Sequence, residues 1–274
     1  MLKRHVWVRR AAVAAAALVG AGAGATAQAA MVGLDWGTTA VGPTETAGVV
    51  AMQNWTSLST SVGTVGGGPT SLRADDGTAA GSVTWVGGTS TNTGLTNSAG
   101  NNRMMFGYLD TAGNTAQTVV TVTGLPASIT GAPYAVIVYY DTPNGTENRV
   151  GRYALSGVTT GANTLYGRDA ASTNFAGTFV QGQTTSPTVV TPGSTFNDAA
   201  AQSVAAGNYL VFTDVSGSSF TLTATPYVSS GNNPRAPING MQIVPMAALP
   251  EPGSVAAAAL AGAGLLLRRA RRRA

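Results

Sequence analysis

Short segments with apolar residues at alternate positions recur through the middle of the chain, separated by clusters of Gly, Ser, Thr, Asn and Pro. Residues 219–225 (SFTLTAT) place Phe, Leu and Ala on one face and Ser or Thr on the other, and residues 117–123 (QTVVTVT) alternate similarly. Alternation is typical of a β-strand with one buried face, because successive side chains point to opposite sides. No stretch of the body has helical apolar spacing, so the pattern predicts an all-β protein.

Residues 134–141 (YAVIVYYD) are continuously apolar up to the final Asp. Such a run is typical of a strand that is buried on both faces. The following turn, residues 141–145 (DTPNG), has Pro to set φ and Asn-Gly to accept a positive φ. We expect this turn to fold the strand back on residues 148–155 as a hairpin. Residues 208–213 (NYLVFT) are likewise expected to pair with 219–225.

The remaining segments predict further strands and two long loops. Strands are expected at 49–55, 82–86, 103–109 and 237–244, the last with a β-bulge at Asn239-Gly240. Long loops are expected at 56–81 and 87–102. About ten short strands in one core predict a single β-sandwich, most simply of the jelly-roll type.

The first 29 residues have a different pattern from the body. A basic start is followed by an apolar run and then by Ala27-Gln28-Ala29. This order predicts a secretory signal peptide that signal peptidase removes after Ala29, with cleavage after Ala27 as the alternative. The exported β-sandwich domain is therefore expected to span residues 30–248.

Residues 249–274 form a third region, in which a Pro-Glu-Pro triplet precedes an apolar run at 253–267. As a helix this run would be about 22 Å long, which is short of the bilayer core of about 30 Å. Arginines close the chain, namely Arg268, Arg269, Arg271, Arg272 and Arg273. Their side chains can extend to the interface, and Arg-rich flanks remain cytoplasmic. We expect a transmembrane helix with the body outside.

This order of parts resembles the PEP-CTERM sorting signal of Gram-negative bacteria, which the membrane protease exosortase recognises. The resemblance implies that Pro250, Glu251 and Pro252 are the recognised motif. It also implies export through the inner membrane, transient anchoring until processing, and a final location at the cell surface or in the extracellular matrix. Two alternatives remain open, a plain tail anchor and an LPxTG-type sortase signal, in which Pro252 would occupy the place of the scissile threonine.

A second resemblance covers most of the body. The segments that carry it are N-W-T, D-D-G-T before V-T-W, G-Y-L-D, N-Y-x-x-F, S-F-T-L-T and R-A-P-I-N-G-x-Q-I-V. They look like the β-sandwich ectodomains that precede PEP-CTERM signals, whose fold is similar to galactose-binding-like jelly rolls. These motifs are structural, and the resemblance implies no ligand residue.

Composition excludes several classes of function. The chain has 15 Lys+Arg and 11 Asp+Glu, but the body alone has six arginines against ten acidic residues, a net charge of −4. An acidic body has no electrostatic footprint for nucleic acid. Cysteine is absent, and His5 and Lys3, the only residues of their kinds, lie in the signal peptide. Catalysis by Ser-His-Asp or Cys-His, imidazole-bound zinc and Schiff-base chemistry are thereby excluded.

Carboxylate chemistry, oxygen-ligated calcium and aromatic platforms remain available. Trp55 and Tyr140 are candidate sugar-binding residues, because aromatic rings offer a flat apolar face and a polar edge. Tyr139 and Tyr140 are expected to point to opposite faces, so at most one of them can line a site, and Asp141 lies beside Tyr140. Arg235 is the fourth candidate, or else it pairs with a carboxylate. Trp85 shares a strand face with Val83 and is expected in the core. Asp75 and Asp76 precede a glycine and are candidate calcium ligands, or else the solvated carboxylates of a turn. No other cofactor is expected.

These observations lead us to expect an exosortase-processed surface or matrix protein with a structural or adhesive role, associated with exopolysaccharide. A carbohydrate-binding module stabilised by calcium is the alternative. A glycosidase would need two carboxyl groups about 5–10 Å apart in one groove, and the sequence does not indicate such a pair. We therefore expect the protein not to be an enzyme.

Overall fold

The computed structural model describes residues 30–37, 39–58, 65–90, 94–110, 117–143, 147–171, 174–187, 203–229 and 235–250. Several predicted features lie outside the described residues. They are the signal peptide with Ala27 and Ala29, the predicted sorting motif from Glu251 onward, the apolar run and the arginine cluster. Within those residues, no helix has the length and apolar character needed to cross a membrane.

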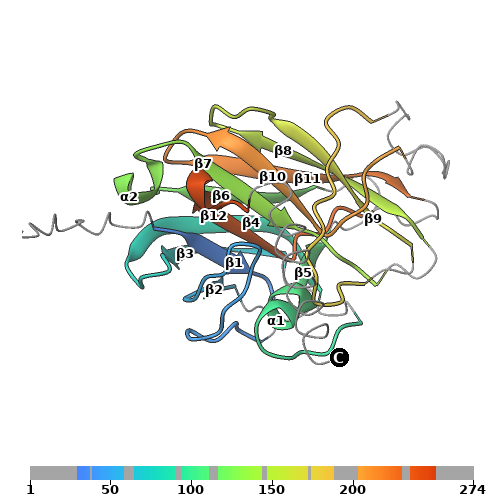
Figure 1. Cartoon of the computed structure of the whole chain (residues 1–274), viewed down its shortest axis with the longest axis horizontal. Coiled ribbons are helices and arrows are strands. Elements are labelled where there is room, and N and C mark those ends of the chain that lie inside the picture. Colours follow the sequence, from blue (N-terminus) through green and yellow to red (C-terminus); the bar gives the residue numbers. More distant parts are fainter. Residues whose placement is uncertain are drawn as a thin grey trace, which may run out of the picture.

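Strands make up most of the regular secondary structure of the described fold (Figure 1). In chain order the elements are β1 (Val32–Asp35), β2 (Thr56–Ser57), β3 (Val65–Arg73), β4 (Ala79–Ser90), α1 (Asn101–Phe106), β5 (Tyr108–Asp110), β6 (Thr118–Thr123), α2 (Ala127–Thr130), β7 (Tyr134–Tyr139), β8 (Arg149–Ser156), β9 (Thr164–Asp169), β10 (Tyr209–Val215), β11 (Phe220–Ser229), β12 (Gly240–Pro245) and the 3₁₀ turn η1 (Met246–Ala248). The predicted all-β class is confirmed.

The strands form two sheets, as a β-sandwich requires. A five-stranded sheet has the order β10-β7-β12-β1-β2, and a seven-stranded sheet has the order β3-β4-β6-β11-β8-β9 with β5 beside β4. The main core contains side chains of both sheets, for example Val136 and Ile243 from the first and Val120 and Leu222 from the second. These apolar side chains therefore join the two sheets.

Strand β7 is buried on both faces, as its continuous apolar run predicts. Val136, Val138 and the following Tyr140 lie in the main core. Ile137 and Tyr139 alternate with them and lie in a second core on the other side of the five-stranded sheet. The expectation that Tyr139 and Tyr140 point to opposite faces is confirmed.

The second core is covered by loops and a short helix. Its members include Met52 and Trp55 from the loop before β2, and Met104 and Met105 from α1. The strand expected at 103–109 is therefore wrong up to residue 106, and only β5 remains of it. A six-residue helix is too short to show an apolar period, so alternation could not distinguish it from a strand.

Two predicted strand pairings are wrong. β7 pairs with β10 and β12, while β8 pairs with β11 and β9 in the other sheet. The turn that begins at Asp141 therefore leads from one sheet to the other and does not close a hairpin. β10 and β11 likewise lie in different sheets. β7 is buried on both faces, whereas β8 has a partly exposed face, so the two strands need different neighbours. This difference favours their placement in different sheets.

The loop expectations also need correction. The segments assigned to loops contain β3 and most of β4, which pair with register shifts at three places. Consecutive glycines in β3 hide the apolar alternation by which a strand is recognised. Conversely, 49–55 is no strand but a turn closed by a bridge between Ala47 and Met52. The strand expected at 82–86 is confirmed within β4, where Val83 and Trp85 are buried in the main core.

The segment 237–244 changes face without a β-bulge. Ile238 pairs with Leu109 beside the seven-stranded sheet. Strand β12 then begins at Gly240 in the five-stranded sheet, and its pairing with β7 has no register shift. The change of face arises because the chain moves from one sheet to the other at Asn239.

Candidate functional site

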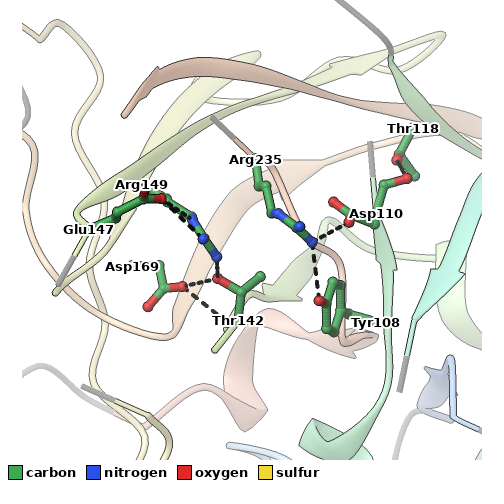
Figure 2. A network of polar contacts seen from close by, with 8 residues as sticks. All are labelled: Tyr108, Asp110, Thr118, Thr142, Glu147, Arg149, Asp169 and Arg235. Atoms are coloured by element: carbon green, nitrogen blue, oxygen red, sulfur yellow. Dashed lines mark hydrogen bonds and ion pairs between the residues drawn. The ribbon is translucent and has the colours of Figure 1, made fainter. Parts of the chain in front are cut away.

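A buried polar network lies where β7 ends (Figure 2). The Thr142 hydroxyl and main-chain N–H both donate to Oδ2 of Asp169, at 2.6 and 3.0 Å. Nη1 of Arg149 donates to the Thr142 hydroxyl at 2.9 Å, and Nη2 contacts Glu147 at 3.1 Å. The network joins the end of β7 in one sheet to β8 and β9 in the other.

Asp141 is tied into the same region by its main chain and by its side chain. Its N–H donates to Oδ1 of Asn239 at 2.6 Å, and its Oδ2 accepts from the N–H of Phe175 at 2.8 Å. Nδ2 of Asn239 donates in turn to the main-chain oxygens of Met105 and Gly107. Three distant parts of the sequence are therefore held together around Asp141.

Burial changes the ionisation of both acids. It raises the pKa of Asp141 from 3.8 to about 7. Burial, together with the nearby Asp141 carboxyl, raises the pKa of Asp169 well above its usual value, against the lowering effect of Thr142 and Arg149. Two carboxyls close together in a desolvated region favour the neutral form of at least one of them.

A cavity of about 280 Å³ opens beside Asp141. It is lined by Asp141, Ala170, Asn174, Phe175, Ala176, Thr178, Val180, Ala206, Gly207 and Asn208. The Asn208 side chain is already engaged, since it bonds the main chain at Val180 and Thr178. Ligand pockets usually have volumes of about 300–1,000 Å³, so this cavity could hold only a small group, with Asp141 as its acidic wall.

The other predicted sugar-binding residues do not meet at this cavity. Trp55 is only 6% exposed in the second core, and its Nε1 donates to the main-chain oxygen of Met52. Tyr140 is 1% exposed, and its hydroxyl donates to the main-chain oxygen of Gly182. Neither ring presents a face to solvent in this structure.

Arg235 takes part in a separate contact. It forms an ion pair with Asp110, and its Nη1 also contacts the hydroxyl of Tyr108 at 3.3 Å (Figure 2). This is the carboxylate pairing that the sequence left as one alternative for Arg235. Trp55 thus lies in the second core and Tyr140 in the main core, while Arg235 is engaged by Asp110, so these residues do not form one site with Asp141.

The candidate calcium ligands lie in the turn between β3 and β4. Oδ1 of Asp75 accepts from the N–H of Met31, and Oδ1 of Asp76 accepts from the N–H and hydroxyl of Thr78. The bonds from Thr78 lower the pKa of Asp76. Within the described residues, no group of three or more His, Cys, Asp or Glu side chains could hold a metal ion.

One buried acid was missed by the sequence interpretation. Asp35, at the end of β1, is fully buried, and burial raises its pKa to about 7. The Ser57 hydroxyl donates to its Oδ1, whereas Oδ2 has no hydrogen-bond partner in the described structure. A single Asp after a short apolar strand gives no pattern by which this burial could have been recognised.

The described fold ends at the start of the predicted sorting motif. After β12, Leu249 packs against the second core, and Pro250 is exposed. Pro250 therefore stands at the surface, directly after Leu249, and is the last residue that the structure describes.

Comparisons with known proteins return no assignment. No protein-family model matches the chain, and no curated protein matches it.

Proposed function

We propose that the chain is an exported, exosortase-processed protein of the cell surface or extracellular matrix, with a structural or adhesive role in association with exopolysaccharide. The observation that carries the proposal is the order of Pro250-Glu251-Pro252, apolar run and arginine cluster at the end of the sequence. Folding of the two sheets as a jelly roll belongs to the same proposal.

The end of the described fold supports this assignment. A protease recognises an extended segment that is free of the folded body, and two prolines around one residue disfavour a helix. Pro250 is exposed, while the preceding Leu249 is half-buried. Cleavage after this point would remove no residue that we see packed in either core.

The test compares the protein in host cells that have exosortase with the same cells lacking it. We expect the mature product to be lighter by part of the tail, and to leave the membrane, only when the protease is present. Identical mass and location in both strains would contradict the proposal. Detection of Arg273 in the mature product of protease-positive cells would instead indicate a plain membrane-anchored protein.

A carbohydrate-binding module is the second candidate, and the cavity beside Asp141 favours it. A carboxyl in a small cavity could orient a sugar hydroxyl or a charged sugar substituent. A glycan array with the wild-type protein and an Asp141→Asn variant, with and without a chelator, tests this candidate. Binding to no glycan, or equal binding by the variant, would remove the cavity from consideration.

A further inference from the structure

One face of the seven-stranded sheet points away from the main core and is made of hydroxyl and small apolar side chains. On its central strands β4, β6, β11 and β8, the inward positions belong to the main core, and side chains between them point outward because a strand alternates. The outward residues are Ser82, Thr84, Val86, Val119, Thr121, Thr123, Thr221, Thr223, Ala154 and Ser156. We name this set the hydroxyl face.

Strand register brings the hydroxyl groups into a row. Thr84 pairs with Thr121, Thr121 with Thr221, and Thr221 with Ser156, across four strands. Ser82 and Thr123 form a parallel row on one side. On the other side a row of Val86, Val119, Thr223 and Ala154 crosses the same strands. Neighbouring strands that carry a row are separated by about 4.8 Å.

These hydroxyl groups contact one another and retain capacity for a ligand. The Ser82 and Thr123 hydroxyls are 3.0 Å apart, and those of Thr121 and Thr221 are 3.2 Å apart. A hydroxyl has one donor and two acceptor positions, so each pair can accept or donate further hydrogen bonds. Thr84, Thr123 and Ser156 are exposed, and Val86 is 56% exposed.

The hydroxyl face carries no charge. Two arginines border it. Arg152 lies opposite Thr225 and Tyr166, two positions along β8 from Ala154. Arg73 lies at the end of β3, which pairs with β4 at Ser82. The six arginines and ten acidic residues of the body all lie at other positions of the sequence. A charged partner would gain no ion pair here, and a neutral partner rich in hydroxyl groups would find matching donors and acceptors.

We propose that the hydroxyl face binds an extended, uncharged polysaccharide chain that lies across the strands along these rows. The strand separation of about 4.8 Å is comparable with the length of one pyranose residue, so each strand can offer a hydroxyl to a successive sugar. Val86 and Val119 supply apolar surface for the C–H faces of the rings. The inference deepens the proposed function by naming the class of polymer. It rests on that function only for the place, outside the cell, at which the protein meets the polymer.

The binding should be weak per sugar and insensitive to salt. A hydroxyl that exchanges a hydrogen bond to water for one to a sugar hydroxyl gains little net free energy, so affinity must come from many repeated contacts along one chain. Longer polymers and several protein copies on one matrix would raise the apparent affinity by multivalency. Because no charge takes part, ionic screening has no ion pair to weaken.

The test uses the purified full chain in mild detergent and measures its retardation in gels that contain a polysaccharide. Hydroxyethylcellulose and xyloglucan are the neutral probes, and alginate is the anionic one. The variant carries Thr121→Arg and Thr221→Arg, in the middle of the hydroxyl face. The matched control carries Thr44→Arg and Thr96→Arg, two exposed threonines outside both sheets.

We expect wild type and control to be retarded by a neutral polymer, equally at about 0.05 and about 0.5 M salt, and the face variant to bind at least about tenfold more weakly. Thermal unfolding of all three proteins checks that the variant is folded. Each of three outcomes would overturn the inference. Neither neutral polymer retards the protein, or a folded face variant binds as well as the wild type, or alginate retards the protein and salt abolishes that retardation. Self-association that the face variant alone abolishes would also overturn it, because the face would then cover a second copy. Exosortase plays no part in this assay, so its failure is distinguishable from failure of the processing test.

Discussion

The side-chain oxygen of Asn239 accepts a hydrogen bond from the main-chain N–H of Asp141 at 2.6 Å, which joins the start of β12 to the end of β7. The amide nitrogen of the same side chain donates to the main-chain oxygens of Met105 and Gly107. Asn239 thus satisfies three main-chain groups at the point where the chain changes sheets, and its own side chain is fully buried.

Substitution Asn239→Ala should therefore be strongly destabilising. It leaves one donor and two acceptors of the main chain without their partner, and each such buried group costs about 1–3 kcal/mol. We expect a loss of about 3 kcal/mol or more in the free energy of unfolding, measured by urea denaturation. Asn163→Ala, at an exposed position just before β9, is the matched control and should change stability by less than about 0.5 kcal/mol. Equal effects of the two substitutions would contradict this account.

Stability should fall as the pH rises through the weakly acidic range. Asp35 contributes to this fall beside Asp141 and Asp169, whose pKa values are also raised by burial. The pKa of Asp35 is raised by burial and by Glu45, against the lowering effects of the Ser57 hydrogen bond and Arg103, from 3.8 to about 7. The unfolded chain releases this proton first, so the stabilisation is complete below the unfolded pKa and is lost as the pH approaches the folded one. A shift of this size corresponds to at most about 4 kcal/mol.

The measurement is urea unfolding at several pH values between about 4 and about 7.5. We expect Asp35→Asn to make the decrease between these limits less steep, since Asn cannot ionise and keeps an acceptor for Ser57. The exposed Asp214→Asn is the control and should leave the profile of the wild type unchanged. A variant profile as steep as that of the wild type would show that Asp35 is not among the groups responsible.

The contact between Gly33 and Trp55 should make Gly33 intolerant of a side chain. A Cβ at Gly33 would lie 2.7 Å from Cδ2 of Trp55, well inside a normal contact. Gly33→Ala should therefore displace the indole and cost about 1–3 kcal/mol, as overpacking does. Gly88→Ala is the matched control, because a Cβ there would meet only the main-chain oxygen of Asp110 at 3.9 Å. Thermal unfolding with Trp fluorescence reports both, and an unshifted midpoint for Gly33→Ala would contradict the packing.

Replacing both prolines of the motif should prevent processing. In a Pro250→Ala and Pro252→Ala variant the chain before the apolar run can continue a helix, because alanine favours one and proline does not. We expect most of the protein to keep its tail and to remain with the membrane, as measured by mass spectrometry of cell fractions. Pro43→Ala, at an exposed proline of the body, serves as control. Normal release of the double variant would show that the extended motif is not what the protease reads.

Local patterning determined which segments become strands wherever alternation was clear. Residues 117–123 and 219–225 became β6 and β11, and the burial on both faces of β7 followed from its continuous apolar run. Where glycines replaced the apolar positions, as in β3, or where the element was as short as α1, the pattern gave the wrong element. Burial of Asp35 and Trp55 could not be predicted, because covering a side chain depends on which distant segment packs over it.

The sequence by itself determined the all-β class, the exclusion of histidine, cysteine and lysine chemistry from the body, and the separate character of the two ends. These follow from residue types and from periods of a few residues, which need no knowledge of distant contacts. Only the tertiary structure decided that β7 and β8 lie in different sheets, that Ile238 pairs with Leu109, and that Thr84, Thr121, Thr221 and Ser156 form one row. Strand pairing joins residues far apart in the chain, and alternation within a strand contains no information about which strand will lie beside it.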